Sequence, residues 1–146
     1  MKEKSSIQIF LAHASEDKPQ VLELYNKLQD EGYKPWIDKE DLLPGQSWPE
    51  EIPKAIRNSD IFIACLSSTS VLKRGYIQRE FRLALNFMAE MPAGQIYLIP
   101  LKLDECEVPD LQQVDYGIAL KNIQWLDYWK PNGFERLLRT INNYFS

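Results

Sequence analysis

Short apolar runs alternate with longer amphipathic stretches along this chain, and this alternation is the feature that most restricts its fold. Four runs have the length and apolar character of buried strands: residues 6–12, 34–37, 59–66 and 95–102. Between them, apolar residues recur every three to four positions, as they do in helices that cover a sheet. Strands that are apolar on both sides and separated by helices form parallel sheets with both faces covered.

The stretches with helical spacing give the expected order of elements. They run from Ser15 to Gly32, over residues 49–56, from residue 74 or 75 to residue 88, and over residues 131–145. Residues 121–125 offer a possible fifth strand. Five strands are too few for an eight-stranded barrel. We therefore predict an α/β fold: a flavodoxin-like, doubly wound, five-stranded parallel sheet with helices on both faces.

Length and composition fit one globular domain, placed at residues 1–146 with its core at about residues 6–145. The formal net charge is −4 without a long run of one sign, so no nucleic-acid partner is expected. The apolar runs are too short to cross a membrane, and the first residues lack the pattern of a signal peptide. Because the chain has two cysteines, we expect free thiols and a cytoplasmic location.

Several chemistries that this architecture supports lack their motifs here. No G-x-G-x-x-G follows the first strand, and neither G-x-x-x-x-G-K-[ST] nor G-x-S-x-G occurs in the sequence. One histidine and two distant cysteines are too few for a typical zinc site. Ligands of such folds bind beyond the carboxyl ends of the strands, so we expect a site among the loops at residues 13–17, 38–48 and 67–75. His13 is expected to make a local hydrogen bond there.

Glu80 is the residue that fits its surroundings least well. On the helix predicted after the third strand, positions four apart share a face, so Glu80 lies in one row with Tyr76 and Ala84. Phe81 and other apolar residues flank this row. Burying a carboxylate is costly, so a carboxylate in such a row marks a candidate site. The spacing by itself also fits a boundary glutamate that reaches water or pairs with a cation.

Four motifs, in the right order, resemble those of Toll/interleukin-receptor (TIR) domains, especially bacterial ones. Residues 10–18 (FLAHASEDK) resemble the opening motif, and residues 36–48 (WIDKEDLLPGQSW) resemble the second-strand motif and the functional loop. Residues 67–80 resemble the third-strand exit and the helix that carries the catalytic glutamate. Residues 133–138 (GFERLL) match the last helix of bacterial members, so the resemblance covers about residues 7–144.

This resemblance implies an NAD⁺ nucleosidase that breaks the bond between nicotinamide and ribose. Many bacterial, plant and some animal members of the family cleave NAD⁺ in this way, and some cyclise the product. Glu80 matches their catalytic glutamate, and Tyr76 stands where they have an aromatic residue, usually tryptophan. NAD⁺ is then the substrate rather than a cofactor, and bacterial immune or anti-phage signalling is the implied role. The implied substrate-binding residues are Ser15, Asp38, Leu42, Trp48 and Tyr76.

Several interpretations remain open. Ser15 also suits a helix cap, Asp38 a loop cap, and Trp48 an anchor for the following helix. The product can be linear or cyclic ADP-ribose, because Tyr76 departs from the usual tryptophan. The alternative function is a non-catalytic TIR scaffold that assembles with other TIR domains through the loop at residues 38–48. Both hypotheses expect self-assembly, and neither needs a membrane.

Four aromatic residues lie close together near the end of the sequence. Large aromatic side chains supply much of the buried area of protein cores. We therefore expect them to pack in the core and to dock the last helix. They are Trp125, Tyr128, Trp129 and Phe134.

Overall fold

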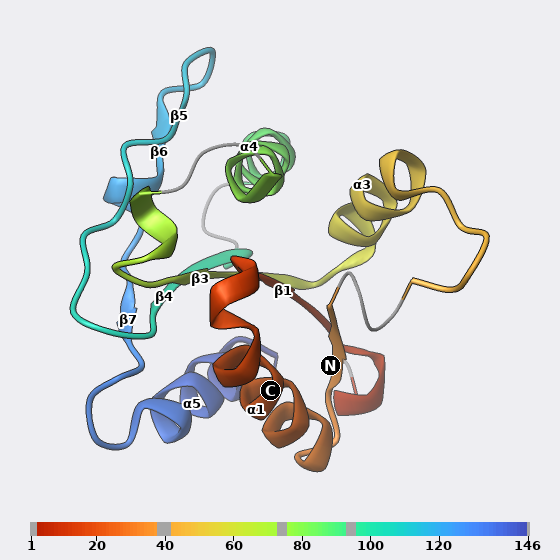
Figure 1. Ribbon diagram of the computed structural model, residues 1–146, viewed down its shortest axis with the longest axis vertical. Helices are drawn as coiled ribbons and strands as arrows, with labels where there is room; N and C mark the ends of the chain where they lie inside the picture. Colours follow the sequence, from red (N-terminus) through yellow and green to blue (C-terminus); the bar gives the residue numbers. More distant parts are fainter. Residues whose placement is uncertain (1–2, 38–41, 73–75, 93–95, 146) are drawn as a thin grey trace.

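The computed structural model describes residues 3–37, 42–72, 76–92 and 96–145. Its five-stranded parallel sheet has the order β2-β1-β3-β4-β7. The strands are β1 (Gln8–Ala12), β2 (Lys34–Trp36), β3 (Ile61–Leu66), β4 (Leu98–Lys102) and β7 (Leu126–Asp127). The helices are α1 (Lys18–Asp30), α3 (Trp48–Asn58), α4 (Tyr76–Ala89) and α5 (Gly133–Phe145). Figure 1 shows α1 and α5 on one face of the sheet and α3 and α4 on the other, so the predicted α/β fold is confirmed.

Alternating side chains of β3 build two separate cores. Every residue of this strand is buried. Phe62, Ala64 and Leu66 join the cluster beneath α3 and α4, whereas Ile61, Ile63 and Cys65 join the cluster beneath α1 and α5. Successive side chains of a strand point to opposite faces. A run that is apolar throughout therefore places this strand at the centre of the sheet, covered on both sides.

Two glycines close turns at the positions that the sequence indicated. Gly32 has a φ of +97°, and its N–H donates to the carbonyl of Gln29. The Tyr33 N–H donates to the carbonyl of Leu28, which completes the six-residue cap that glycine favours at the end of a helix. Gly45 has a φ of +94° in the turn that follows Pro44, as expected for a proline–glycine turn.

The predicted fifth strand is present but starts later than expected. Residues Leu120–Asn122 form a short 3₁₀ turn, and β7 begins only at Leu126. The reason is tertiary, because the Leu120 side chain is fully buried in the cluster beneath α3 and α4. A small antiparallel hairpin, β5 (Gln112–Gln113) and β6 (Ile118–Ala119), precedes this turn and was not predicted. Figure 1 shows the hairpin projecting beyond α4.

The core prediction for the late aromatic residues is half wrong. Tyr128 and Phe134 pack against the cluster beneath α1 and α5. Trp125 and Trp129, however, are 38% and 42% exposed. The Lys102 ammonium lies 4.2 Å from the centre of the Trp125 ring, so a cation–π contact replaces burial there.

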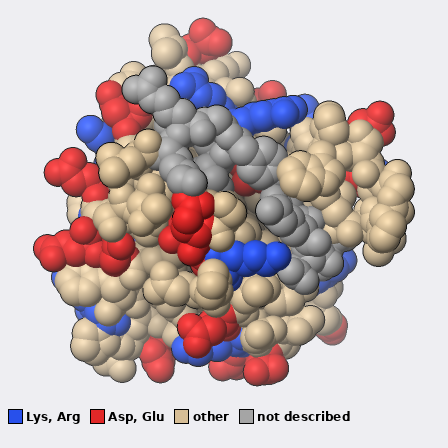
Figure 2. Space-filling view, viewed as in Figure 1, with Lys and Arg blue, Asp and Glu red and all other residues tan. Residues whose placement is uncertain are grey.

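No helix in the described part of the chain is long and apolar enough to cross a membrane. Basic and acidic side chains are interspersed on the face drawn in Figure 2, without a broad basic field among the coloured residues.

Gly133 starts α5 at a point of close backbone approach. A Cβ atom at this position would lie 2.2 Å from the carbonyl oxygen of Tyr128. Because that oxygen belongs to the backbone, the clash cannot be relieved by a side-chain rotation. We expect Gly133→Ala to lower the free energy of unfolding by about 1–3 kcal/mol, as overpacking does. Urea denaturation measures it, with Asn143→Ala on the exposed side of α5 as the control. Equal stability of the two variants would contradict the close approach.

Candidate active site

A cavity of about 180 Å³ lies between the first turns of α3 and the first half of α4. Trp48, Pro49, Ile52 and Pro53 line it from α3, and Arg79, Glu80 and Leu83 line it from α4. Most of this wall is apolar, with one carboxylate and one guanidinium. A small apolar pocket with a few converging polar groups is the usual form of a ligand site.

Glu80 is buried in the wall of this cavity. Its side chain is 2% exposed, and its neighbours Phe81, Ala84 and Leu85 belong to the core. The interpretation of Glu80 as a boundary residue that reaches water is therefore wrong. Desolvation makes a buried carboxylate costly. Such a residue in a cavity is a candidate for chemistry.

Stacked aromatic rings fix the position of α4 over the sheet. The ring of Phe62 stacks on Phe10 with 5.2 Å between centroids, and Phe10 stacks on Trp36 at 5.1 Å. The edge of Phe81 meets Phe62 at 6.1 Å with an interplanar angle of 87°. Because Phe81 follows Glu80 directly, this contact sets the rotation of α4 that turns the carboxylate toward α3.

The structure brings two of the predicted site residues together. Trp48, which is 44% exposed as the first residue of α3, lines the same cavity as Glu80. Tyr76 is the first residue of α4, one turn before Glu80, and its side chain is outside the described part. Asp38 also lies outside the described residues.

Ser15 and Leu42 do not line the cavity. Ser15 is exposed in the 3₁₀ turn Ser15–Asp17 after β1, where its hydroxyl donates to the Glu16 carboxylate at 2.6 Å. It does not cap α1, so that interpretation is wrong. Leu42 is half-buried and packs against the core beneath α3 and α4.

A polar network that the sequence did not reveal joins the exits of β1, β3 and β4. The Ser67 hydroxyl donates to the Asp17 carboxylate at 2.9 Å and accepts from the Ser70 N–H at 3.0 Å. The Ser68 hydroxyl donates to Asp104 at 2.8 Å. The Asp17 side chain therefore ties the first loop to the segment that leads into α4. The acidic residue and the serine-rich loop were visible in the sequence, whereas their pairing across fifty positions was not.

His13 makes the expected local contact, with its Nδ1 3.3 Å from the carbonyl oxygen of Leu11. Among the described residues, no group of three histidine, cysteine, aspartate or glutamate side chains has a metal-binding arrangement.

Burial raises the pKa of Asp17 above its ordinary value of 3.8, although the Ser67 hydrogen bond and His13 lower it in part. Compared with the unfolded chain, the folded chain therefore binds the proton of this carboxyl more tightly. This contribution to stability is fully present below about pH 3.8 and is lost as the pH rises through the higher, folded pKa. We expect the free energy of unfolding of Asp17→Asn, relative to that of wild type, to increase as the pH rises from about 3.8 through the folded pKa of Asp17.

Urea unfolding of both proteins at a series of pH values measures this difference. Groups that titrate alike in both proteins do not contribute to the difference. The groups coupled to Asp17 include His13, Asp104 and Glu16, together with the thiols of Cys65 and Cys106. A stability difference that stays constant with pH would contradict the raised pKa.

The comparison with known families and proteins agrees with the fold. A family model described as a TIR domain matches residues 9–139. Among curated proteins, the chain is similar to the uncharacterized protein y4cD of Sinorhizobium fredii, with 34% identity over 97 residues. The match covers 66% of this chain and 15% of that protein, so the chain spans a small part of the relative.

Solved structures with the same fold include the TIR domain of the Toll-related receptor TRR-2 from Hydra magnipapillata. It has a TM-score of 0.70 and 25% identity, covering 92% of this chain and 97% of that one. The TIR domains of the activated Roq1 resistosome, which directly recognises the pathogen effector XopQ, match with a TM-score of 0.58 and 23% identity. This match covers 66% of this chain and 57% of that one. A prokaryotic SEFIR domain matches with a TM-score of 0.61 and 15% identity, covering 97% of this chain and 100% of that one. The last two matches show the fold alone. Because the family model spans most of the sequence, this chain belongs to the TIR domain family.

Proposed function

We propose that this chain is an NAD⁺ nucleosidase in which Glu80 stabilises the ribosyl cation that forms as nicotinamide leaves. The observation that carries the proposal is the burial of the Glu80 carboxylate in the wall of the α3–α4 cavity. Family membership supports it, because residues 67–80 resemble the segment that holds the catalytic glutamate in NAD⁺-cleaving TIR domains. The products are nicotinamide and either ADP-ribose or cyclic ADP-ribose.

One carboxylate is sufficient for this reaction. Most glycosidases need a second carboxyl group to protonate the leaving oxygen. In NAD⁺ the bond between the ribose C1′ and the pyridine nitrogen breaks with its electron pair moving to the ring, so nicotinamide departs neutral. An anionic Glu80 then stabilises the positive charge that develops on the ribose. Water adds to C1′ and loses a proton, or an adenine nitrogen of the same molecule adds and closes the ring.

The size of the cavity fits one end of the substrate. Pockets that enclose whole ligands usually measure about 300–1,000 Å³, and this cavity measures about 180 Å³. We place the nicotinamide ring between Trp48 and Leu83, with the ribose beside Glu80. Tyr76 and Asp38 are proposed for the nicotinamide ring and the ribose hydroxyls, and Leu42 for an apolar edge of the pocket. Ser15, exposed beyond β1, is proposed as a more distant phosphate contact.

Product analysis tests the reaction type. Purified protein is incubated with NAD⁺ at high concentration, and the products are separated by chromatography and identified by mass. Nicotinamide with equal amounts of ADP-ribose, linear or cyclic, is the expected result. Nicotinamide mononucleotide with AMP would show cleavage at the diphosphate instead and would contradict the proposal.

A TIR scaffold is the second candidate, and an exposed leucine favours it. Leu43 is 65% exposed in the loop before α3, the loop that the scaffold hypothesis assigns to assembly, so a second TIR domain can cover it there. The Roq1 TIR domains are seen in an activated resistosome. By analogy, we propose that this chain assembles with other TIR domains in the cytoplasm, in immune or anti-phage signalling.

Self-association tests the scaffold. Leu43→Lys is expected to lower the assembled fraction in sedimentation velocity, with Leu72→Lys as control, because Leu72 is also exposed but lies in the loop after β3. Equal assembly of Leu43→Lys and wild type would contradict a role for this loop. The two functions are compatible, since assembly can complete a catalytic site.

A further inference from the structure

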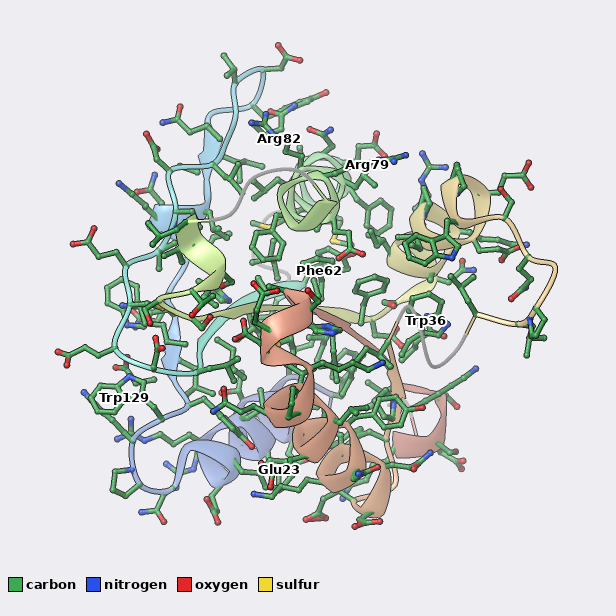
Figure 3. All side chains as sticks on the ribbon, in the orientation of Figure 1. Glu23, Trp36, Phe62, Arg79, Arg82 and Trp129 are labelled. Atoms are coloured by element: carbon green, nitrogen blue, oxygen red, sulfur yellow. The ribbon has the colours of Figure 1, made fainter. Side chains whose placement is uncertain are left out.

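Arg79 places a positive charge in the wall of the same cavity as Glu80. The two residues are neighbours on α4, and both line the space between α4 and α3. The Glu80 side chain is buried, whereas Arg79 is exposed. Figure 3 shows Arg79 leaving α4 on the side of α3. Among the described residues, no carboxylate forms an ion pair with Arg79.

The dimensions of the cavity require most of a dinucleotide to lie outside it. Once nicotinamide and its ribose occupy a space of about 180 Å³, the next chemical group along NAD⁺ is the diphosphate. That group carries the negative charge of the molecule and has to pass the rim. A guanidinium can bind two phosphate oxygens at once through parallel N–H donors.

We propose that Arg79 binds the diphosphate of the substrate and so selects nucleotide substrates over nucleosides, which carry no phosphate. This inference rests on the proposed function, because it takes the nicotinamide end of NAD⁺ as the occupant of the cavity. Arg79 acts in substrate binding, and Glu80 acts in the chemical step. The division predicts that the two residues affect different kinetic constants.

Arg82 provides a matched control on the same helix. It is exposed like Arg79 but does not line the cavity. In Figure 3 it leaves α4 on the side of the β5–β6 hairpin. Arg82→Gln therefore removes the same charge from the same helix without touching the proposed diphosphate site.

The first measurement is the dissociation constant of ADP-ribose, which carries the diphosphate but no nicotinamide, by calorimetry at low salt. We expect Arg79→Gln to raise it about tenfold, the effect of losing a charge-assisted contact. Arg79→Lys is expected to keep part of the affinity, and Arg82→Gln to match wild type. Added salt is expected to weaken binding by wild type more than by Arg79→Gln. No binding by wild type, or equal affinities of wild type and Arg79→Gln, would overturn the inference.

The second measurement separates this inference from the proposed function. With NAD⁺, Arg79→Gln is expected to raise KM about tenfold and keep kcat. With nicotinamide riboside, which has no phosphate, wild type and Arg79→Gln are expected to react equally. Binding of ADP-ribose that depends on Arg79, without any release of nicotinamide, would contradict the proposed function and support the diphosphate site. Release of nicotinamide by Arg79→Gln with an unchanged KM would support the proposed function and contradict the diphosphate site.

Discussion

Glu80→Gln is expected to lower the rate of nicotinamide release from NAD⁺ by about 10²- to 10³-fold, the usual loss when a preorganised electrostatic contact is removed from a transition state. Glutamine has nearly the same shape, so the packing around position 80 should be retained. The side chain is 2% exposed, so solvent has little access to position 80 to compensate for the lost negative charge. The effect is therefore expected mainly in kcat.

The control for this variant is Glu90→Gln, which removes an exposed carboxylate just beyond the end of α4. Both variants lower the negative charge of the chain by one, but only Glu80 lines the cavity. Circular dichroism and urea unfolding confirm that each protein is folded. If Glu80→Gln released nicotinamide as fast as Glu90→Gln, the proposed catalytic role of Glu80 would be contradicted.

Phe62→Ala is expected to lower the free energy of unfolding by about 3–5 kcal/mol, a large share of the roughly 5–15 kcal/mol that stabilises a typical domain. Phe62 is fully buried at the centre of the sheet and contacts the rings of Phe10, Phe81 and Tyr97. Its removal leaves a cavity under α4 and frees Phe81 to turn. We therefore expect nicotinamide release to fall as well, although Phe62 is not among the residues that line the site.

Equilibrium unfolding in urea measures this loss, with Tyr116→Ala as the control. Tyr116 is a large aromatic residue that is 67% exposed at the tip of the β5–β6 hairpin, so its truncation should change stability by less than about 0.5 kcal/mol. A loss of less than about 1 kcal/mol for Phe62→Ala would contradict the stacked core as the element that positions α4.

The sequence was sufficient to predict most of the fold because its strongest signals are local. A run such as Ile61–Leu66, apolar at every position and only six residues long, is typical of a central strand of a covered sheet. Gly32 and Gly45 close turns that need a positive φ, which glycine adopts at little cost. These features depend on neighbours within a few residues, and pattern and turn chemistry reveal them directly.

Features that depend on distant partners could not be predicted. The fifth strand begins late because Leu120 is buried beneath α3 and α4, and nothing near Leu120 in the sequence specifies that contact. Trp125 looked like a core residue but lies beside Lys102 at the surface. Asp17 and Ser67 are fifty positions apart, and their hydrogen bond appears only when the carboxyl ends of β1 and β3 are placed side by side.

The candidate site was predicted in part for the same reason. Glu80 stood out in the sequence because it interrupts an apolar helical row, and the structure buries it as such a row requires. The family resemblance implied Trp48 as a substrate-binding residue, and it lines the same cavity as Glu80. Arg79 could be assigned to this cavity only after the relative rotation of α3 and α4 was known. Arg79 gave no signal in the sequence, since exposed arginines are common on helices.

The most direct test of the central claim is the amount of nicotinamide that the wild-type protein releases from NAD⁺, measured by chromatography over a rising series of protein concentrations. If Glu80 in the α3–α4 cavity is catalytic, the amount of nicotinamide released is expected to increase with protein concentration. The increase is steeper than linear if assembly completes the site. In Glu80→Gln, release is expected to fall to the background. Absence of nicotinamide at every concentration, including with the protein held at high density on a surface, would contradict the claim.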